Sequence, residues 1–245
     1  MTTRRILKVS GTDRLDFLQG LITNDIAKLS NGLVYAALLT PQGKYIADFF
    51  LKAEGDTILL DASEAQADDL LRRLTMYKLR ADVSIATTDL ALHRGTGDVP
   101  PDALVDPRHP ALGWRAYRAA PESDDGSDWD AIRVAHCIPE SGIELTPDTF
   151  ILEANFEALN GVDFRKGCYV GQEVTARMKH KTTLRKGLTR VDVDGEAAAG
   201  SEITAGEKAA GTLFTRAGNA AIAYLRFDRA KGELRADKAR VSMNT

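Results

Sequence analysis

The chain has 245 residues, of which 44% are hydrophobic and 27% are charged, a composition ordinary for a globular protein with one large domain or two to three small ones. Its formal net charge of −3 gives no global attraction to nucleic acid or to acidic membranes. Two cysteines are too few for a disulfide framework, and no apolar stretch reaches the length of a membrane span. No long apolar run follows Met1 to Arg5, so we expect no signal peptide and predict a cytoplasmic protein without membrane or DNA partners.

The first third of the chain predicts strands between two helices. A helix from Thr12 to Ile22 is indicated by a capping threonine and by leucines that recur on one face. A second helix, from Ser63 to Tyr77, carries a Ser63-x-x-Gln66 capping box. Apolar runs bounded by Gly-containing turns predict strands at 33–39, 45–51 and 57–60.

The middle of the chain predicts short strands, a loop and one helix. Strands are expected at 83–85, 90–93 and 113–118, and the Pro-rich stretch 99–110 is expected to be a loop. The acidic run from Glu122 to Asp130 reads as a surface loop before a helix from Asp128 to His136. Because this order is not a regular βαβ series, it favours an α+β fold.

The sequence pattern changes after Lys186. Short β-like runs are separated by glycines, which indicates a small antiparallel β-barrel; the runs are 188–193, 212–215, 220–227 and 239–243. We therefore predict an α+β region at 1–183 and a C-terminal barrel domain at 184–245.

The stretch from Lys166 to Glu173 concentrates reactive side chains. It reads Lys166-Gly167-Cys168-Tyr169-Val170-Gly171-Gln172-Glu173. A thiol that follows a cation and precedes a helix start should have thiolate character, which makes Cys168 a candidate reactive group and Lys166 its cation. The alternative is a buried, inert cysteine. Gly167 either adopts a backbone conformation closed to other residues or lets a partner approach closely.

This stretch, followed by Val174-Thr175-Ala176-Arg177, resembles the signature of the YgfZ family of folate-binding proteins, which is related to the glycine cleavage T-protein, an aminomethyltransferase. Further blocks with this resemblance are Ser10 to Arg14 with Phe17 to Gly20, Thr23 to Asp25, Leu39 to Lys44 with Asp48, Arg73-Leu74 with Tyr77 to Arg80, Ile138-Pro139, and Ala154 to Val162.

The resemblance implies a T-protein-like fold of small subdomains around a central channel where folate binds, with two of them interleaved in 1–183. It implies tetrahydrofolate as the ligand and iron–sulfur client proteins as partners. The expected function is support of iron–sulfur cluster assembly or repair, including enzymes of tRNA modification. No reaction is implied, so whether the chain is an enzyme stays open.

Two other functions compete with this one. A T-protein-like aminomethyltransferase is disfavoured because the chain is short and has a cysteine signature where T-proteins usually carry an aromatic-Ile-Gly-Lys-Glu type segment. An RNA-binding module would use the basic segment 164–190, which has eight cations and one acid, but the segment lacks interleaved aromatics. This segment is otherwise a solvated basic face.

The resemblance assigns folate contacts to residues outside the signature. Asp48 falls where T-proteins carry an aspartate essential for folate; the alternative is a solvated strand face. Arg133 falls near a folate-proximal arginine, or is a surface helix residue. Lys166 and Arg177 suit the carboxylates of the glutamate tail. Gln172 and Glu173 either belong to the site or simply open a helix, where negative charge is stabilising.

No metal site is expected. The histidines are scattered, and Cys137 and Cys168 do not give zinc-ligand spacing with them; the histidines are His93, His109, His136 and His180. Two cysteines cannot build a four-cysteine iron–sulfur site within one chain.

Overall fold

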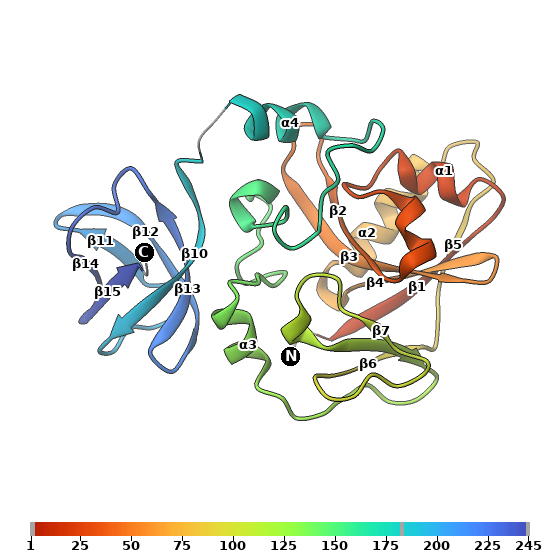
Figure 1. Cartoon of the computed structure of the whole chain (residues 1–245). Coiled ribbons are helices and arrows are strands. Elements are labelled where there is room, and N and C mark those ends of the chain that lie inside the picture. The colour runs from red at the N-terminus through yellow and green to blue at the C-terminus, as the bar shows by residue number, and fades with distance from the viewer. Residues whose placement is uncertain (1–2, 182–183, 244–245) are drawn as a thin grey trace. The chain divides into compact units, whose positions relative to one another are not determined.

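A computed structural model describes residues 3–181 and 184–243 (Figure 1). Contacts divide the chain into two units, the first made of Met1–Ser127 and Phe156–Ala176 and the second of Asp128–Asn155 and Arg177–Thr245. The predicted boundary between 183 and 184 adjoins residues 182–183, which lie outside the described residues, and it stays a prediction.

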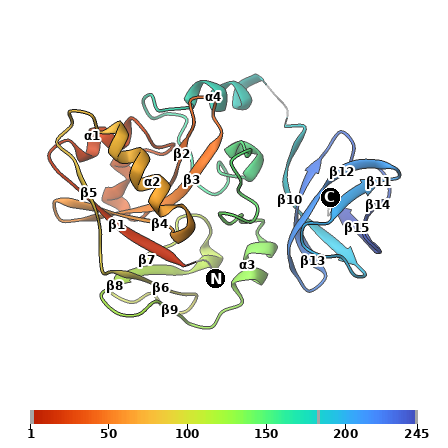
Figure 2. The same ribbon diagram turned by 180° about the vertical axis from the view of Figure 1, so that it is seen from behind.

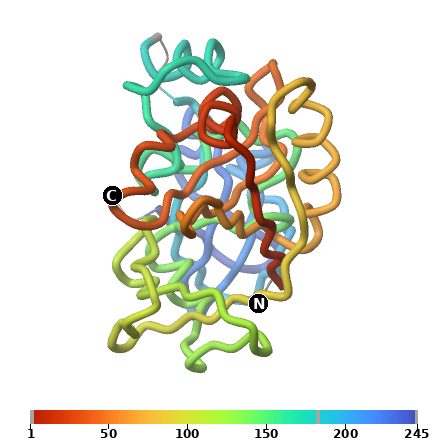
Figure 3. The backbone as a smooth tube through the Cα atoms, turned by 90° about the vertical axis from the view of Figure 1, so that its right-hand side faces the viewer, coloured from red at the N-terminus to blue at the C-terminus, as the bar shows by residue number. Residues whose placement is uncertain are grey.

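The first unit is built on a five-stranded antiparallel sheet with the order β2-β3-β4-β1-β5. Its strands are β1 (Arg4–Ser10), β2 (Val34–Leu39), β3 (Tyr45–Glu54), β4 (Thr57–Ser63) and β5 (Ser84–Thr87). Three helices accompany it: α1 (Arg14–Gln19), the 3-10 helix η1 (Ile26–Asn31) and α2 (Glu64–Tyr77). Leu18 of α1 and Leu70 and Leu74 of α2 share one apolar core with Phe49 and other strand residues. Figure 3 shows the coil of α2 alongside β1.

The other side of the central strands is also buried, and it is partly polar. The Tyr35 ring lies 5.1 Å from both the Phe50 and the Phe156 ring, measured between centroids. Asp61, with no exposed surface, accepts hydrogen bonds from Arg4 and Arg115. Burial opposes ionisation, but the two guanidinium groups hold the pKa of Asp61 below its usual range. The buried charge of Asp61 is therefore paired, which offsets the free energy lost when the carboxylate leaves water.

A second, four-stranded sheet completes the first unit, with the order β7-β8-β6-β9. Its strands are β6 (Ala91–Gly95), β7 (Leu104–Val105), β8 (Trp114–Arg118) and β9 (Ser123–Asp124), and the 3-10 helix η2 (Pro110–Leu112) precedes β8. The stretch 99–110, predicted as a loop, thus contains a two-residue strand. Such a strand is too short to give a periodic signal.

The second unit contains a closed six-stranded barrel (Figure 2) with the order β10-β13-β12-β11-β14-β15. The strands are β10 (Lys186–Asp194), β11 (Glu202–Ala205), β12 (Lys208–Ala217), β13 (Ala220–Arg226), β14 (Leu234–Ala236) and β15 (Ala239–Met243). The unit also holds α3 (Trp129–Ala135) and the 3-10 helix η3 (Ile151–Ala154), and α4 (Gln172–Lys181) spans the division between the units. The predicted barrel and α+β content are confirmed, while the short strands β11 and β14 were missed.

The predicted capping box is wrong. Ser63 precedes α2 but makes no side-chain capping hydrogen bond, because it is still the last residue of β4 and its side chain is buried. Gln66 reaches β3 instead, where its side chain bonds the Tyr45 hydroxyl and the Ile46 carbonyl. The first helix is also shorter than predicted, ending at Gln19.

Candidate functional site

The segment that leads to the signature is fastened first by Thr23 and Asn24. The Thr23 hydroxyl donates to the Gly161 carbonyl at 2.6 Å and accepts from the Ala37 amide at 2.8 Å. The Asn24 amide donates to the carbonyls of Asn160 and Tyr35 at 2.7 and 2.8 Å. Both side chains are buried. The sequence offered them only as part of a resembling block, without this role.

Lys166 makes the second attachment. Its ammonium donates to the carbonyl oxygens of Gln19 and Ile22, at 2.6 and 2.5 Å, and lies 4.8 Å from the centre of the Tyr169 ring. The residue is only 6% exposed. Burial lowers the pKa of Lys166 to about 8, against the opposing pull of Asp25 and Asp163. At pH 7 the group therefore remains a cation that holds the loop to the end of α1.

Gly171 makes the third attachment. Its φ is +86°, and an added Cβ would stand 2.7 Å from the Thr40 carbonyl oxygen. Gly43, in the turn between β2 and β3, has φ +75°, and an added Cβ there would stand 2.9 Å from the Val174 side chain. Two glycines thus let the start of α4 lie directly on this turn. The buried Thr175 hydroxyl then donates to the Gly171 carbonyl at 3.2 Å.

Cys168 is exposed between the second and third attachments. Within the described ranges, the hydrogen bonds of Lys166 go to the two carbonyls and not to this thiol. Gly167 has no positive φ, and an added Cβ there would meet nothing within 4 Å. The expectation that Gly167 adopts a backbone conformation closed to other residues is therefore wrong. The alternative, that this glycine lets a partner approach closely, stays a prediction.

The rest of the signature starts α4. Tyr169 is buried, which raises the pKa of its phenol, while a hydrogen bond with Thr175 opposes the shift. Gln172 is the first residue of the helix, and Glu173 is exposed in its first turn. Glu173 is placed to stabilise the helix start, and both readings of Gln172 and Glu173 stay open.

Asp48 is buried in β3, at 4% exposure, rather than on a solvated strand face. Its two carboxylate oxygens accept hydrogen bonds from the hydroxyls of Tyr35 at 3.0 Å and Tyr45 at 2.6 Å. Strict alternation would put Tyr45 and Asp48 on opposite faces. The register between β2 and β3 shifts between Leu38 and Leu39, opposite Tyr45, and this bulge turns both side chains to one side.

The turn that carries Gly43 also links Asp48 to the signature. An added Cβ on Gly171 would lie 3.0 Å from the Leu39 side chain, and Leu39 pairs with Tyr45. The first unit therefore brings the signature and Asp48 to the same end of the β2–β3 hairpin.

Arg133 belongs to the second unit and is buried, not a surface residue. Its guanidinium donates to Glu144 at 2.6 Å, to Asp130 at 2.9 Å and to the Ile138 carbonyl at 3.2 Å. These partners give it a structural role in that unit. Arg177 is exposed on α4 and makes no ion pair or hydrogen bond with the described residues.

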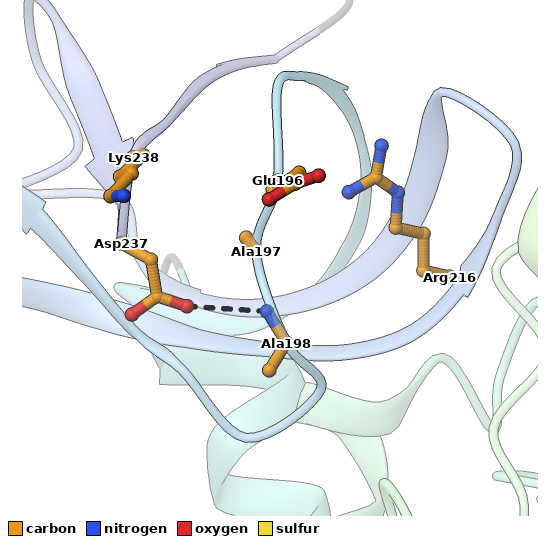
Figure 4. Close-up of a pocket in the computed structure, with 6 residues that line it drawn as sticks. All are labelled: Glu196, Ala197, Ala198, Arg216, Asp237 and Lys238. Carbon is orange, nitrogen blue, oxygen red and sulfur yellow. Dashed lines mark hydrogen bonds between the residues drawn. The ribbon is translucent and has the colours of Figure 1, made fainter.

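Among the described residues, no group of three or more His, Cys, Asp or Glu is arranged to hold a metal ion. Pockets occur in both units. A pocket of about 370 Å³ lies at the barrel (Figure 4), where Asp237 accepts from the Ala198 amide. Another, of about 290 Å³, is lined in the first unit by Asn24, Lys28, Leu33, Val34, Tyr35, Pro107 and Asn160. Neither pocket is lined by a predicted signature residue.

Gly171→Ala should destabilise the protein, whereas Gly167→Ala should not. The first change adds a methyl group to a positive-φ residue against a backbone oxygen, which should lower the free energy of unfolding by about 1–3 kcal/mol. The second adds a methyl group in open space. Urea unfolding of both variants measures this difference, and equal stabilities would contradict the described packing.

Cys168 should react with iodoacetamide at pH 8 at least about tenfold faster than Cys137. Cys168 is exposed, whereas burial raises the pKa of the Cys137 thiol to about 12. Peptide mass spectrometry after timed alkylation follows both thiols in one sample. Faster labelling of Cys137 in the folded protein would show that the loop geometry is wrong.

Several known proteins are similar to this chain. Residues 185–245 match the family model "CAF17, C-terminal beta-barrel domain". A protein of Mycosarcoma maydis named iron–sulfur cluster assembly factor IBA57 homolog, mitochondrial, is 31% identical over 75% of this chain and 54% of its own length. The mitochondrial assembly factor IBA57 of Mus musculus is 30% identical over 94% of this chain and 78% of its own length. The chain spans about half the length of the first fungal relatives.

A solved structure shows the same fold. The glycine cleavage system aminomethyltransferase T of Bartonella henselae superposes with a TM-score of 0.78, covering 99% of this chain and 83% of that one at 14% identity. The predicted T-protein-like α+β fold with a C-terminal barrel is therefore confirmed.

The predicted cytoplasmic location is wrong, since the named relatives are mitochondrial proteins and point to that compartment instead. No helix in the described part of the chain combines the length and the apolar character needed to cross a membrane. The particular likeness to YgfZ stays a prediction. The mouse relative, 30% identical and covered over 78% of its length, shows that the chain belongs to the IBA57 family.

Proposed function

We propose that this chain supports the assembly or repair of iron–sulfur clusters in client proteins, among them enzymes of tRNA modification. The observation that carries the proposal is the exposed Cys168 thiol on a loop fastened at three places. Its relatives are named iron–sulfur cluster assembly factors. A thiolate is the protein ligand of iron–sulfur clusters, and one thiol supplies one of the several ligands needed. The remaining ligands belong to the client or its carrier.

Tetrahydrofolate is the proposed ligand of the first unit, with Asp48 as its anchor. Asp48 accepts the hydroxyl protons of Tyr35 and Tyr45, and a carboxylate offers about four acceptor sites in all. The N–H groups of a pterin edge match this acceptor pair. The buried position of Asp48 would make such hydrogen bonds strong, and ligand entry would require Tyr35 or Tyr45 to share the carboxylate. The Lys166 ammonium already donates to two main-chain carbonyls, so it is less suited to the glutamate tail than its sequence position suggests.

The competing function is one-carbon transfer to tetrahydrofolate, as in an aminomethyltransferase. The shared fold favours it, but at 14% identity this likeness concerns the fold alone. The exposed thiol has no part in that transfer chemistry. The two functions therefore differ in what the loss of Cys168 would do.

Asp48→Asn should weaken tetrahydrofolate binding at least about tenfold, because the loss of a charged hydrogen-bond partner in a dry site typically costs about 2–5 kcal/mol. Calorimetric titration of the wild type and the variant measures this effect. Asp56→Asn, in the exposed turn between β3 and β4, is the matched control and should bind normally. Equal affinities for wild type and Asp48→Asn would remove Asp48 from the site.

Cells that lack this protein should lose activity of a subset of iron–sulfur enzymes while glycine cleavage continues. Complementation with Cys168→Ala should fail, because the signature contains no second thiol. Cys137→Ala should complement, since that thiol is half-buried and its raised pKa disfavours the thiolate form. Normal cluster enzymes with lost glycine cleavage in the deletion strain would overturn the proposal in favour of aminomethyl transfer.

A further inference from the structure

Leu79 is an unusual residue for its position. It follows Lys78, the C-cap of α2, and has φ +44°. Glycine or asparagine usually occupies the left-handed position after a helix, because a side chain with a Cβ is strained there. Leu79 is also 86% exposed. Neither backbone strain nor burial explains a leucine here, so stability alone would select against it.

Leu79 belongs to a group of exposed apolar side chains. Met76, near the end of α2, is 63% exposed, and Leu15 of α1 is 45% exposed. The residues before α1 meet the segment after α2, since the Asp13 amide donates to the Asp82 carbonyl and the Thr12 amide donates to the Asp82 carboxylate. Figures 1 and 2 both show α1 beside the segment between α2 and β5. We call Met76, Leu79 and Arg80 the α2-end patch.

Arg80 supplies the charge of this patch. It is exposed and has no hydrogen bond or ion pair with any described residue. Asp82, two residues further along the chain, accepts hydrogen bonds from Thr12. A guanidinium without a partner beside exposed leucine and methionine suits a carboxylate next to an apolar side chain.

The adjoining sheet edge indicates the shape of the occupant. β5 is the last strand of its sheet, and no strand in 3–181 or 184–243 pairs with its outer edge. Its residues Ser-Ile-Ala-Thr contain neither charge nor proline, the features that usually protect an open edge. Such an edge accepts an added strand through main-chain hydrogen bonds.

We propose that an extended acidic segment of another protein binds here, adding a strand to β5, placing an apolar side chain on Leu79 and Met76 and a carboxylate on Arg80. This surface lies at the start of α1, whereas Lys166 is held at its end. The inference goes beyond the proposed function, since binding at the patch requires neither folate nor the Cys168 thiol.

The test is selection of a random dodecapeptide phage library on the wild-type protein, with counter-selection on the double variant Leu79→Asn, Arg80→Glu. Enriched peptides should carry Asp or Glu beside an apolar residue. As synthetic peptides, they should bind Leu79→Asn at least about tenfold more weakly than wild type, the loss expected for removal of an apolar anchor. Met243→Asn, which alters an exposed apolar residue of the barrel, should leave binding unchanged.

Stability separates a binding role from a structural one. Asparagine tolerates the left-handed conformation, so Leu79→Asn should unfold at a temperature equal to or above that of the wild type. A lower unfolding temperature would assign Leu79 to the fold and overturn the proposal. So would enrichment of basic peptides, the absence of peptides that distinguish the double variant, or a wild-type dimer that Leu79→Asn dissociates, which would make the occupant a second copy of this chain.

Discussion

The buried ammonium of Lys166 is the contact on which the signature loop depends. Its hydrogen bonds to the carbonyls of Gln19 and Ile22 connect residues more than 140 positions apart in sequence. Burial disfavours the charged form and lowers the pKa of the group to about 8. A buried ammonium loses hydration free energy that a neutral side chain at this position would not lose. Such an arrangement is understandable where the position of the loop matters more than stability.

Because both ends of the loop are anchored in the first unit, the Cys168 thiol has a defined position and remains accessible. Lys166 points into the unit, Gly171 lies on the β2–β3 turn, and Cys168 remains exposed between them. A thiol on a fastened loop loses little conformational entropy when a partner engages it. The same turn leads to Asp48, so one hairpin supports both the thiol and the buried carboxylate that we propose as the folate anchor.

Much of this fold was predictable from local patterns, because β2, β3 and β4 are apolar runs bounded by turns and α2 has apolar residues at helical spacing. Contacts between distant segments were not. The hydrogen-bond partners of Lys166 are two main-chain carbonyls, which carry no sequence signal, and its predicted influence on the Cys168 thiol stays a prediction. Likewise, Tyr45 meets Asp48 only through a bulge, and Gln66 bonds β3 rather than capping its own helix.

Complementation with Lys166→Met tests the central claim most directly, because this variant keeps Cys168 and removes only the ammonium beneath it. We predict that Lys166→Met fails to restore iron–sulfur enzyme activity in the deletion strain, and that Lys166→Arg, which keeps the charge with altered geometry, restores part of it. Full activity of Lys166→Met, at a protein level equal to wild type, would show that the thiol does not need its loop to be held and would contradict this account.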